Sequence, residues 1–91
     1  MPWYVYIIQC KDKSLYTGIT NNLKRRIKEH NSGNGCKYTK YRRPVSLIHS
    51  EEFPTKSQSL KREAYIKRLT RQGKAALVLA QGRFRNAKGL S

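Results

Sequence analysis

Residues 3–30 read WYVYIIQCKDKSLYTGITNNLKRRIKEH, and this stretch decides the fold. Two short runs rich in aromatic and β-branched residues, Trp3–Gln9 and Leu15–Thr20, flank the polar segment Lys11–Ser14. Runs of this composition on either side of a short polar segment predict a β-hairpin with a longer loop. The chain therefore opens with two antiparallel strands.

Side chains alternate between the two faces of each predicted strand. Tyr4, Tyr6 and Ile8 share one face of the first strand, and Tyr16 and Gly18 share one face of the second. A glycine inside a strand leaves room for a close neighbour or a ligand. We therefore expect tyrosines to gather beside an open position on one face of the hairpin.

A helix follows the hairpin. Asn21 or Asn22 can cap its start, and the segment 31–33 can end it. The inward stripe of this helix is formed by the residues spaced at i, i+4 and i+7, which are Leu23, Ile27 and His30.

Arg26 borders that stripe, whereas Arg25 and Lys28 point elsewhere. One arginine and one histidine, His30, thus face the strands that carry the tyrosines. Each residue alone has a simpler interpretation, because strand tyrosines usually pack and helical arginines usually extend along the surface. Their convergence beside a glycine is what favours a functional site.

An ordered set of motifs resembles the GIY-YIG nuclease family. Tyr4-Val5-Tyr6 and Tyr16-Thr17-Gly18 stand where the two signature tripeptides would be, and the helix 23–30 carries the expected arginine and histidine. The loop 33–39 and a later Glu63 continue the match. The resemblance covers most of the chain and is closest to a bacterial branch in which the nuclease module stands alone.

The resemblance implies a fold, an activity and a cofactor. The fold is α/β (α+β), with a three-stranded antiparallel sheet flanked by helices. The activity is metal-dependent hydrolysis of DNA phosphodiester bonds, selective for structure rather than sequence. One Mg²⁺ or Mn²⁺ ion, which prefers hard oxygen ligands, would be bound by Glu63. The residues carried over as catalytic are Tyr6, Tyr16, Arg26, His30 and Glu63.

Within this scheme we expect Tyr6 to take a proton from the attacking water and Tyr16 to position the water or the phosphate. Arg26 would stabilise charge on the phosphoryl oxygens, because its planar fork suits phosphate. The ordinary tyrosine pKa of about 10 is too high for an effective base at neutral pH. We expect Arg26 and the metal to lower it, and His30 to orient a tyrosine or share its proton.

Three departures from the family pattern bear on activity. The tripeptides read YVY and YTG, which keep both tyrosines and Gly18. The asparagine that many members carry after the helix glutamate is missing, since Gln72 and Lys74 occupy that region and Asn86 comes much later. The chain leaves no room for a second recognition domain, so we expect no sequence-specific cutting. A non-catalytic DNA- or RNA-binding module therefore stays open as the alternative, and a ribosome-associated protein as a weaker one.

Glu63 also has a purely structural interpretation. Lys67 follows it by four residues on a predicted helix, a spacing at which an ion pair stabilises the helix by a few tenths of a kcal/mol. Position alone favours this ion pair, and the metal-binding role comes from the resemblance.

Composition limits the class of protein and of partner. The 91 residues are enough for one domain, which we place at residues 1–82, followed by a flexible basic tail at 83–91. Lys and Arg number 20 and Asp and Glu 5, a formal net charge of +15. Such charge favours a polyanion partner, DNA or RNA. No apolar run is long enough for a membrane span, and we expect a cytoplasmic, monomeric protein.

The two cysteines, Cys10 and Cys36, lie far apart in the sequence. In the cytoplasm we expect them to be free thiols. Together with His30 and His49 they lack the CxxC or HxxxH spacing typical of a zinc site.

A basic, glycine-containing loop at residues 31–43 alternates cations with aromatic side chains. Cationic side chains bind phosphates and aromatic rings stack on bases, so this composition is typical of a nucleic-acid-binding groove. The alternative is a solvated loop on a basic protein. The residues that we expect to contact nucleic acid are Gly18, Lys37, Tyr38, Lys40, Tyr41, Arg42, Arg43 and Lys74.

The remaining elements follow from shorter signals. A third strand, Val45–Phe53, would lie beside the first through a right-handed crossover, giving the sheet order 2-1-3. We expect His49 and the acidic pair after it to be exposed strand residues and not ligands. Thr55 with Gln58 predicts a second helix that reaches about Leu69 and is buried on more than one side. A short third helix, residues 71–80, would end at Gly82.

Overall fold

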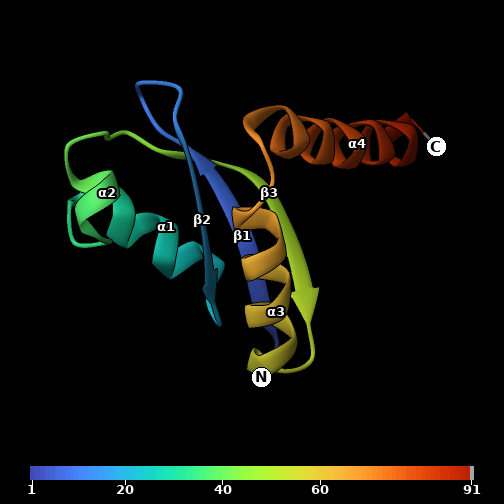
Figure 1. Ribbon diagram of the computed structural model, residues 1–91, viewed down its shortest axis with the longest axis horizontal. Helices are drawn as coiled ribbons and strands as arrows, with labels where there is room; N and C mark the ends of the chain where they lie inside the picture. The colour runs from blue at the N-terminus through green and yellow to red at the C-terminus, as the bar shows by residue number, and fades with distance from the viewer. Residues whose placement is uncertain (91) are drawn as a thin grey trace.

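The computed structural model describes the backbone of residues 1–90 and the side chains of residues 1–80. Its elements follow the predicted order, with one additional helical turn (Figure 1). They are β1 Trp3–Gln9, β2 Leu15–Thr20, α1 Leu23–Ser32, α2 Lys37–Lys40, β3 Ser46–Phe53, α3 Lys56–Lys67 and α4 Arg71–Leu90.

The three strands form one antiparallel sheet in the order β2-β1-β3, as predicted. The central strand β1 is the most buried element, with four consecutive residues, Val5–Ile8, shielded from solvent. Tyr6 pairs with Gly18 of β2 on one side and with Ser50 of β3 on the other. The hairpin thereby sets the first tyrosine directly opposite the glycine.

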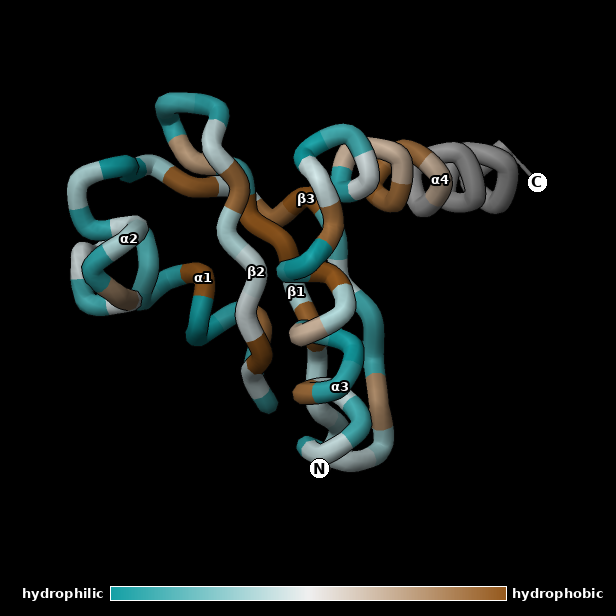
Figure 2. Tube along the Cα trace, in the orientation of Figure 1, coloured by the Kyte–Doolittle hydropathy of each residue, from teal (hydrophilic) through white to brown (hydrophobic). Residues whose placement is uncertain are grey.

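Each face of β1 supports its own hydrophobic cluster. On one face Tyr6 and Ile8 pack with Leu23 and Ile27 of α1. On the other face lie Val5 and Ile7, packed against α3 and the start of α4 through Ile66, Leu77 and Val78. Figure 2 shows the resulting pattern, with apolar segments along β1 and polar segments in the turns and on α1. The predicted division of β1 between two faces is confirmed.

The ends of α1 follow from its sequence. The Asn22 side chain accepts a hydrogen bond from the Arg25 backbone amide at 3.0 Å, so Asn22 is the cap. Gly33 ends the helix in the left-handed region at φ 91°, which glycine adopts without steric cost. Between these ends Leu23, Ile27 and His30 face the sheet as predicted.

A β-bulge in β3 overturns the predicted exposure of His49. Ile7 pairs with His49 whereas Ile8 pairs with Leu47, so the register shifts by one residue. Ile48 and His49 therefore both contribute to the α3 side of the sheet, where strict alternation would separate them. His49 is buried and lies 2.7 Å from the Glu51 carboxylate, which makes its expected solvent exposure wrong.

Three predictions about the helices also need correction. The expected loop at 31–43 contains a helical turn, α2. The helix α3 begins at its predicted Thr55 cap but is buried on one side only, because Leu60 and Tyr65 are exposed. The helix α4 continues through Gly82 to Leu90, since the strong helix formers around it outweigh a glycine cost of about 1 kcal/mol.

The predicted flexibility of residues 83–91 stays a prediction. Their side chains, and all of Ser91, lie outside the part of the chain that the structure describes. Among the described residues, no helix combines the length and the apolar character needed to cross a membrane.

Candidate active site

Tyr6, Arg26 and His30, which the sequence predicts to lie together, meet at the hydroxyl oxygen of Tyr6. The hydroxyl oxygen of Tyr6 lies 2.9 Å from Nε2 of His30. Arg26 donates from Nε to the same oxygen at 3.4 Å. Tyr6 is only 1% exposed and His30 is fully buried, so β1 and α1 enclose this cluster between them. The sequence-based expectation that α1 turns Arg26 and His30 toward the hairpin tyrosines is confirmed.

Gly18 is required by the packing of the two tyrosine rings. A Cβ atom at this position would lie 2.6 Å from the Tyr6 hydroxyl oxygen and 3.2 Å from Cε2 of Tyr16. The ring centroids of Tyr6 and Tyr16 are 6.5 Å apart. The room that Gly18 leaves is therefore occupied by the chain's own tyrosines in this structure.

Sequence reasoning missed two residues that hold the cluster from the α1–α2 connection. Thr39 is fully buried, and its hydroxyl oxygen lies 2.8 Å from Nδ1 of His30. The carbonyl of Gly35 accepts a hydrogen bond from Nη2 of Arg26 at 3.0 Å. A Cβ on Gly35 would overlap the His30 ring. The only available signal was that both residues lie in the loop 33–39, which continues the family resemblance.

Burial raises the pKa of both tyrosines above the ordinary value. For Tyr6 the hydrogen bond and charge of Arg26 oppose this rise, and the charges of Cys36 and Glu63 add to it. For Tyr16 burial and the neighbouring Cys36 raise the pKa to about 12. Arg26 lowers the pKa of Tyr6 and Tyr16 as expected, but the desolvation of a phenolate outweighs this one nearby cation, so the net shift of the pKa is upward.

His30 is neutral at physiological pH. Burial, followed by the positive charge of Arg26, lowers its pKa to about 4. A neutral imidazole has one N–H donor and one bare acceptor nitrogen. His30 can therefore accept a hydrogen bond, and later a proton, at only one of its two nitrogens.

Glu63 forms the ion pair that its position predicts, and its role as a metal ligand stays a prediction. Its carboxylate lies 3.4 Å from Nζ of Lys67, which is the ion pair expected from the sequence. The side chain is only 18% exposed, and its charge acts on Tyr6 across the sheet. This charge is the smallest of the named contributions to the pKa of Tyr6, and among the described residues the ion-pair partner of Glu63 is Lys67.

The donor set near Glu63 suits a metal that keeps most of its water. Within residues 1–80 no three His, Cys, Asp or Glu side chains gather into a site that could enclose an ion. One carboxylate with open coordination positions fits Mg²⁺, which is commonly held by one or two carboxylates plus water and phosphate oxygens. The binding of one hard divalent cation by Glu63 stays a prediction.

Comparison with known proteins places this geometry in a family. The model of the GIY-YIG catalytic domain matches residues 2–76. The chain belongs to the GIY-YIG family. A UPF0213 protein of Clostridium perfringens is 57% identical to it over 75 residues, covering 82% of this chain and 81% of that protein. The UPF0213 protein YazA of Bacillus subtilis is 52% identical over 71 residues, covering 78% and 72%.

Two solved structures share the fold. The solution structure of the UPF0213 protein from Bacillus halodurans has a TM-score of 0.61 and 44% sequence identity, covering 100% of this chain and 98% of that one. A protein of E. faecalis has a TM-score of 0.63 and 44% identity, covering 90% and 88%. The sheet order and helix order predicted from the sequence therefore belong to a GIY-YIG domain.

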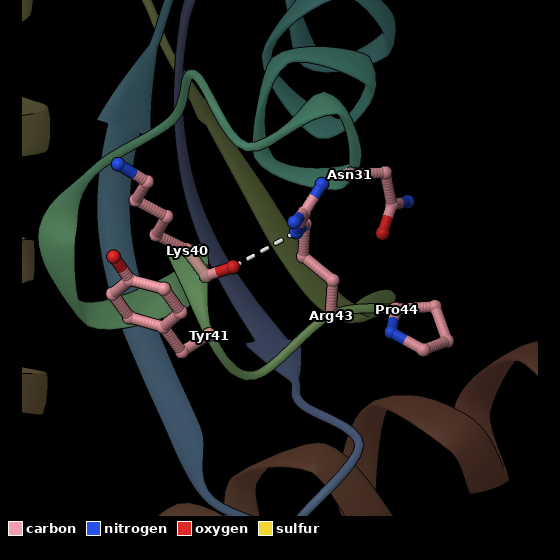
Figure 3. Close-up of a pocket in the computed structure, with 5 residues that line it drawn as sticks. All are labelled: Asn31, Lys40, Tyr41, Arg43 and Pro44. Carbon is pink, nitrogen blue, oxygen red and sulfur yellow. Dashed lines mark hydrogen bonds between the residues drawn. The ribbon is translucent and has the colours of Figure 1, made fainter.

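The end of α1, the end of α2 and the segment 41–44 that follows α2 border a basic hollow of about 560 Å³ (Figure 3). Arg43 donates to the backbone carbonyl of Lys40 at 2.8 Å, which orders the turn between them. Tyr41 is 85% exposed on the rim, within 5.5 Å of the Lys40 ammonium group. The other lining residues are Asn31 and Pro44.

The remaining predicted nucleic-acid residues are not equivalent to one another. Arg42 is paired with Asp12 at 3.1 Å and stacks on the Tyr38 ring at 4.3 Å, so it links α2 to the hairpin loop. Lys37 is exposed on α2. Lys74 lies on α4, which packs on the opposite face of the sheet, so the structure does not bring it to the others.

Proposed function

We propose that this GIY-YIG chain is an endonuclease that hydrolyses DNA phosphodiester bonds with one Mg²⁺ or Mn²⁺ ion. The observation that carries the proposal is the Tyr6 oxygen, contacted by both Nε2 of His30 and Nε of Arg26. A phenol between a proton acceptor and a guanidinium serves proton transfer and phosphate binding, the two tasks of phosphodiester hydrolysis.

Arg26 provides the phosphate-binding group. Its contact with Tyr6 is long at 3.4 Å, and its side chain is 27% exposed, so the guanidinium can exchange this contact for a phosphoryl oxygen. Gly35 holds the other end of the fork through its carbonyl. The planar guanidinium is then already in position to donate hydrogen bonds to the phosphoryl oxygens as negative charge develops on them.

Tyr6 becomes accessible when Arg26 turns to the phosphate. Its oxygen then has a free lone pair for the attacking water, while its other neighbour remains Nε2 of His30. The less buried Tyr16 lies against the same His30 ring, at a centroid distance of 5.4 Å, and orients the water or the phosphate. His30 is the final acceptor of the proton.

Glu63 would hold the divalent cation, together with water and phosphate oxygens. When bound, such an ion polarises the phosphate and stabilises the leaving oxygen. The chain's own contribution is to keep the carboxylate mostly buried on α3, from where its charge acts on Tyr6 across the sheet.

The substrate is held through its phosphates. The net charge of +15 and the basic hollow beside α2 favour sequence-independent contact with DNA, with RNA as the alternative polyanion. The exposed Tyr41 ring adds a stacking surface for an unpaired base. We expect the protein to act as a monomer on structured DNA.

A binding module without turnover is the second candidate. It is favoured by the raised pKa of Tyr16, the Glu63–Lys67 ion pair and the missing family asparagine. Asn86, the only later asparagine, lies where the structure describes no side chains.

The deciding experiment is a panel of linear, nicked, flapped, branched and single-stranded DNAs incubated with Mg²⁺, with Mn²⁺ and with EDTA. We expect cleavage or nicking of at least one structured DNA that EDTA abolishes. Tight binding to the whole panel with no metal-dependent product would instead support the binding module. Cleavage that survives EDTA would contradict the metal-dependent assignment.

A further inference from the structure

Thr39 is a buried hydroxyl that the proposed chemistry leaves without a role. It lies in α2, is fully buried, and reaches Nδ1 of His30 at 2.8 Å. Its hydroxyl also donates to the backbone carbonyl of Cys36 at 3.4 Å, one helical turn earlier. Buried polar groups of this kind are expected to have every hydrogen accounted for.

The hydrogen atoms in the network formed by Tyr6, His30 and Thr39 can be arranged in two ways. A neutral His30 carries one proton, either on Nδ1 toward Thr39 or on Nε2 toward Tyr6. The surroundings of the Tyr6 hydroxyl decide between these two tautomers.

Tyr6 is 1% exposed, and its hydroxyl oxygen has two hydrogen-bonding neighbours among the described residues. One of them, Nε of Arg26, is a donor and cannot accept the phenolic hydrogen. Nε2 of His30 is therefore the acceptor within reach. If Nε2 carried the proton, the Tyr6 hydrogen would be buried without a partner, at a cost of about 1–3 kcal/mol.

We propose that Thr39 is a positioning residue that fixes the tautomer of His30, so that Nδ1 carries the proton and the bare Nε2 faces Tyr6. Thr39 accepts from Nδ1 and passes its own hydrogen to the Cys36 carbonyl. The hydrogen bonds of this network then all run in one direction, from the Tyr6 hydroxyl through His30 and Thr39 to the backbone carbonyl of Cys36.

The catalytic consequence rests on the proposed function. As the attacking water gives a proton to the Tyr6 oxygen, the hydroxyl proton of Tyr6 moves to Nε2 of His30. One water O–H bond and one tyrosine O–H bond break, a new tyrosine O–H bond and an N–H bond form, and the products are hydroxide and imidazolium. With the other tautomer Nε2 would already be protonated, and the transfer would stop at Tyr6.

The chain provides a matched control for removing the hydroxyl. Thr17 is also a buried threonine, and its hydroxyl has no hydrogen-bond partner among the described residues. Thr17→Val therefore makes the same change in a buried strand position without touching His30. Thr39→Ser keeps the hydroxyl and removes only the methyl group.

Long-range ¹H–¹⁵N correlation spectra of the full-length protein at neutral pH read the tautomer directly. The His30 signals are assigned by comparison with the His49→Gln variant. We expect an unprotonated Nε2 in the wild type, in Thr39→Ser and in Thr17→Val, and a protonated Nε2 or a mixture of tautomers in Thr39→Val. A protonated Nε2 in the wild type would overturn the proposal, and this spectrum requires no variant at position 39 to fold.

Single-turnover cleavage tests the consequence separately. Thr39→Val should be roughly 10-fold to 100-fold slower than the wild type, the loss found when the partner that orients a functional histidine is removed. Thr39→Ser and Thr17→Val should retain the wild-type rate. Equal rates for the two valine variants would overturn the positioning role. If no DNA is cleaved at all, the proposed function fails while the spectra still decide the tautomer.

Discussion

At the scale of single residues, two adjacent arginines on α1 have different surroundings. The Arg25 side chain is 61% exposed, with its guanidinium 4.0 Å from Glu29. Arg26 is 27% exposed, pairs with the same Glu29 at 3.1 Å, and also contacts the Tyr6 oxygen and the Gly35 carbonyl. We predict that Arg26→Ala slows single-turnover cleavage on the order of 10²–10³-fold, the loss typical of one transition-state donor. Arg25→Ala should change the rate little.

The controls for this prediction separate chemistry from charge. Arg26→Lys should restore only part of the rate, because an ammonium group does not reproduce the planar fork. Circular dichroism and DNA affinity should change much less than the rate in both Arg26 variants. Equal losses from the two alanine variants would mean that both arginines only hold the DNA backbone, and the assignment of α1 to the active site would be wrong.

The titration of His30 predicts how stability depends on pH. Its folded-state pKa of about 4 lies below the ordinary 6.5, so at intermediate pH the unfolded chain binds a proton that the folded chain excludes. The free energy of unfolding is therefore highest above about pH 6.5 and falls as the pH is lowered to about 4, by at most about 1.4 kcal/mol per pH unit.

Urea unfolding across this pH window measures the effect, with His30→Gln as the control that removes it. The side-chain carboxylates change the free energy of unfolding only at lower pH, as Glu51 illustrates. Burial would raise the pKa of Glu51, but hydrogen bonds from Arg62 and His49 outweigh it and hold the pKa below the ordinary 4.5. A stability that stays constant down to pH 4.5 in the wild type would contradict the assignment of a buried, neutral His30.

At the scale of elements, α2 and the turn after it are predicted to carry a large part of the contact with phosphate. If about five phosphates are neutralised, log K should fall with log salt at a slope of about −4.5 on duplex DNA. Lys40→Ala and Arg43→Ala should each flatten the slope by about 0.9, because both cations border the hollow. Fluorescence anisotropy at several salt concentrations in EDTA measures this without cleavage.

Arg42→Ala is the matched comparison on the same element. Its guanidinium is already paired with Asp12 and stacked on Tyr38, so its loss should lower stability more than it changes the slope. The combined variant without Lys37, Lys40, Arg42 and Arg43 should bind weakly with the flattest slope. An unchanged slope in that variant would show that this surface is not the binding site.

At the scale of the whole molecule, the features predicted correctly from the sequence rest on local periodicity. Alternation in β1 placed Tyr6 and Val5 on opposite faces, and the helical spacing of Leu23, Ile27 and His30 turned Arg26 toward the sheet. These patterns need no knowledge of which distant segments meet, so the two faces of β1 and the central cluster could be predicted. The sheet order was predicted separately, from the rule that crossovers are right-handed.

The features that were missed depend on distant contacts. Thr39 and Gly35 reach His30 and Arg26 only because the connection after α1 folds back on that helix. The burial of His49 follows from a bulge that breaks the alternation of β3. The direction of the tyrosine pKa shifts depends on how deeply the hairpin is covered, which no spacing in the sequence specifies.

The central claim is that a carboxylate on α3 serves the tyrosine cluster on the other face of the sheet. Its most direct test is single-turnover cleavage in Mg²⁺ by Glu63→Gln and Glu52→Gln, two variants with the same change of charge. Glu52 is exposed on β3 and provides the control. DNA affinity is measured for both in EDTA.

We predict that Glu63→Gln loses at least about 10²-fold in rate, as expected when several kcal/mol of metal-dependent stabilisation are removed. Its DNA affinity should be unchanged or slightly higher, because Lys67 loses its carboxylate partner. Glu52→Gln should cleave at the wild-type rate. Wild-type cleavage by Glu63→Gln would contradict the account, and the ion pair with Lys67 would then be the whole role of this residue.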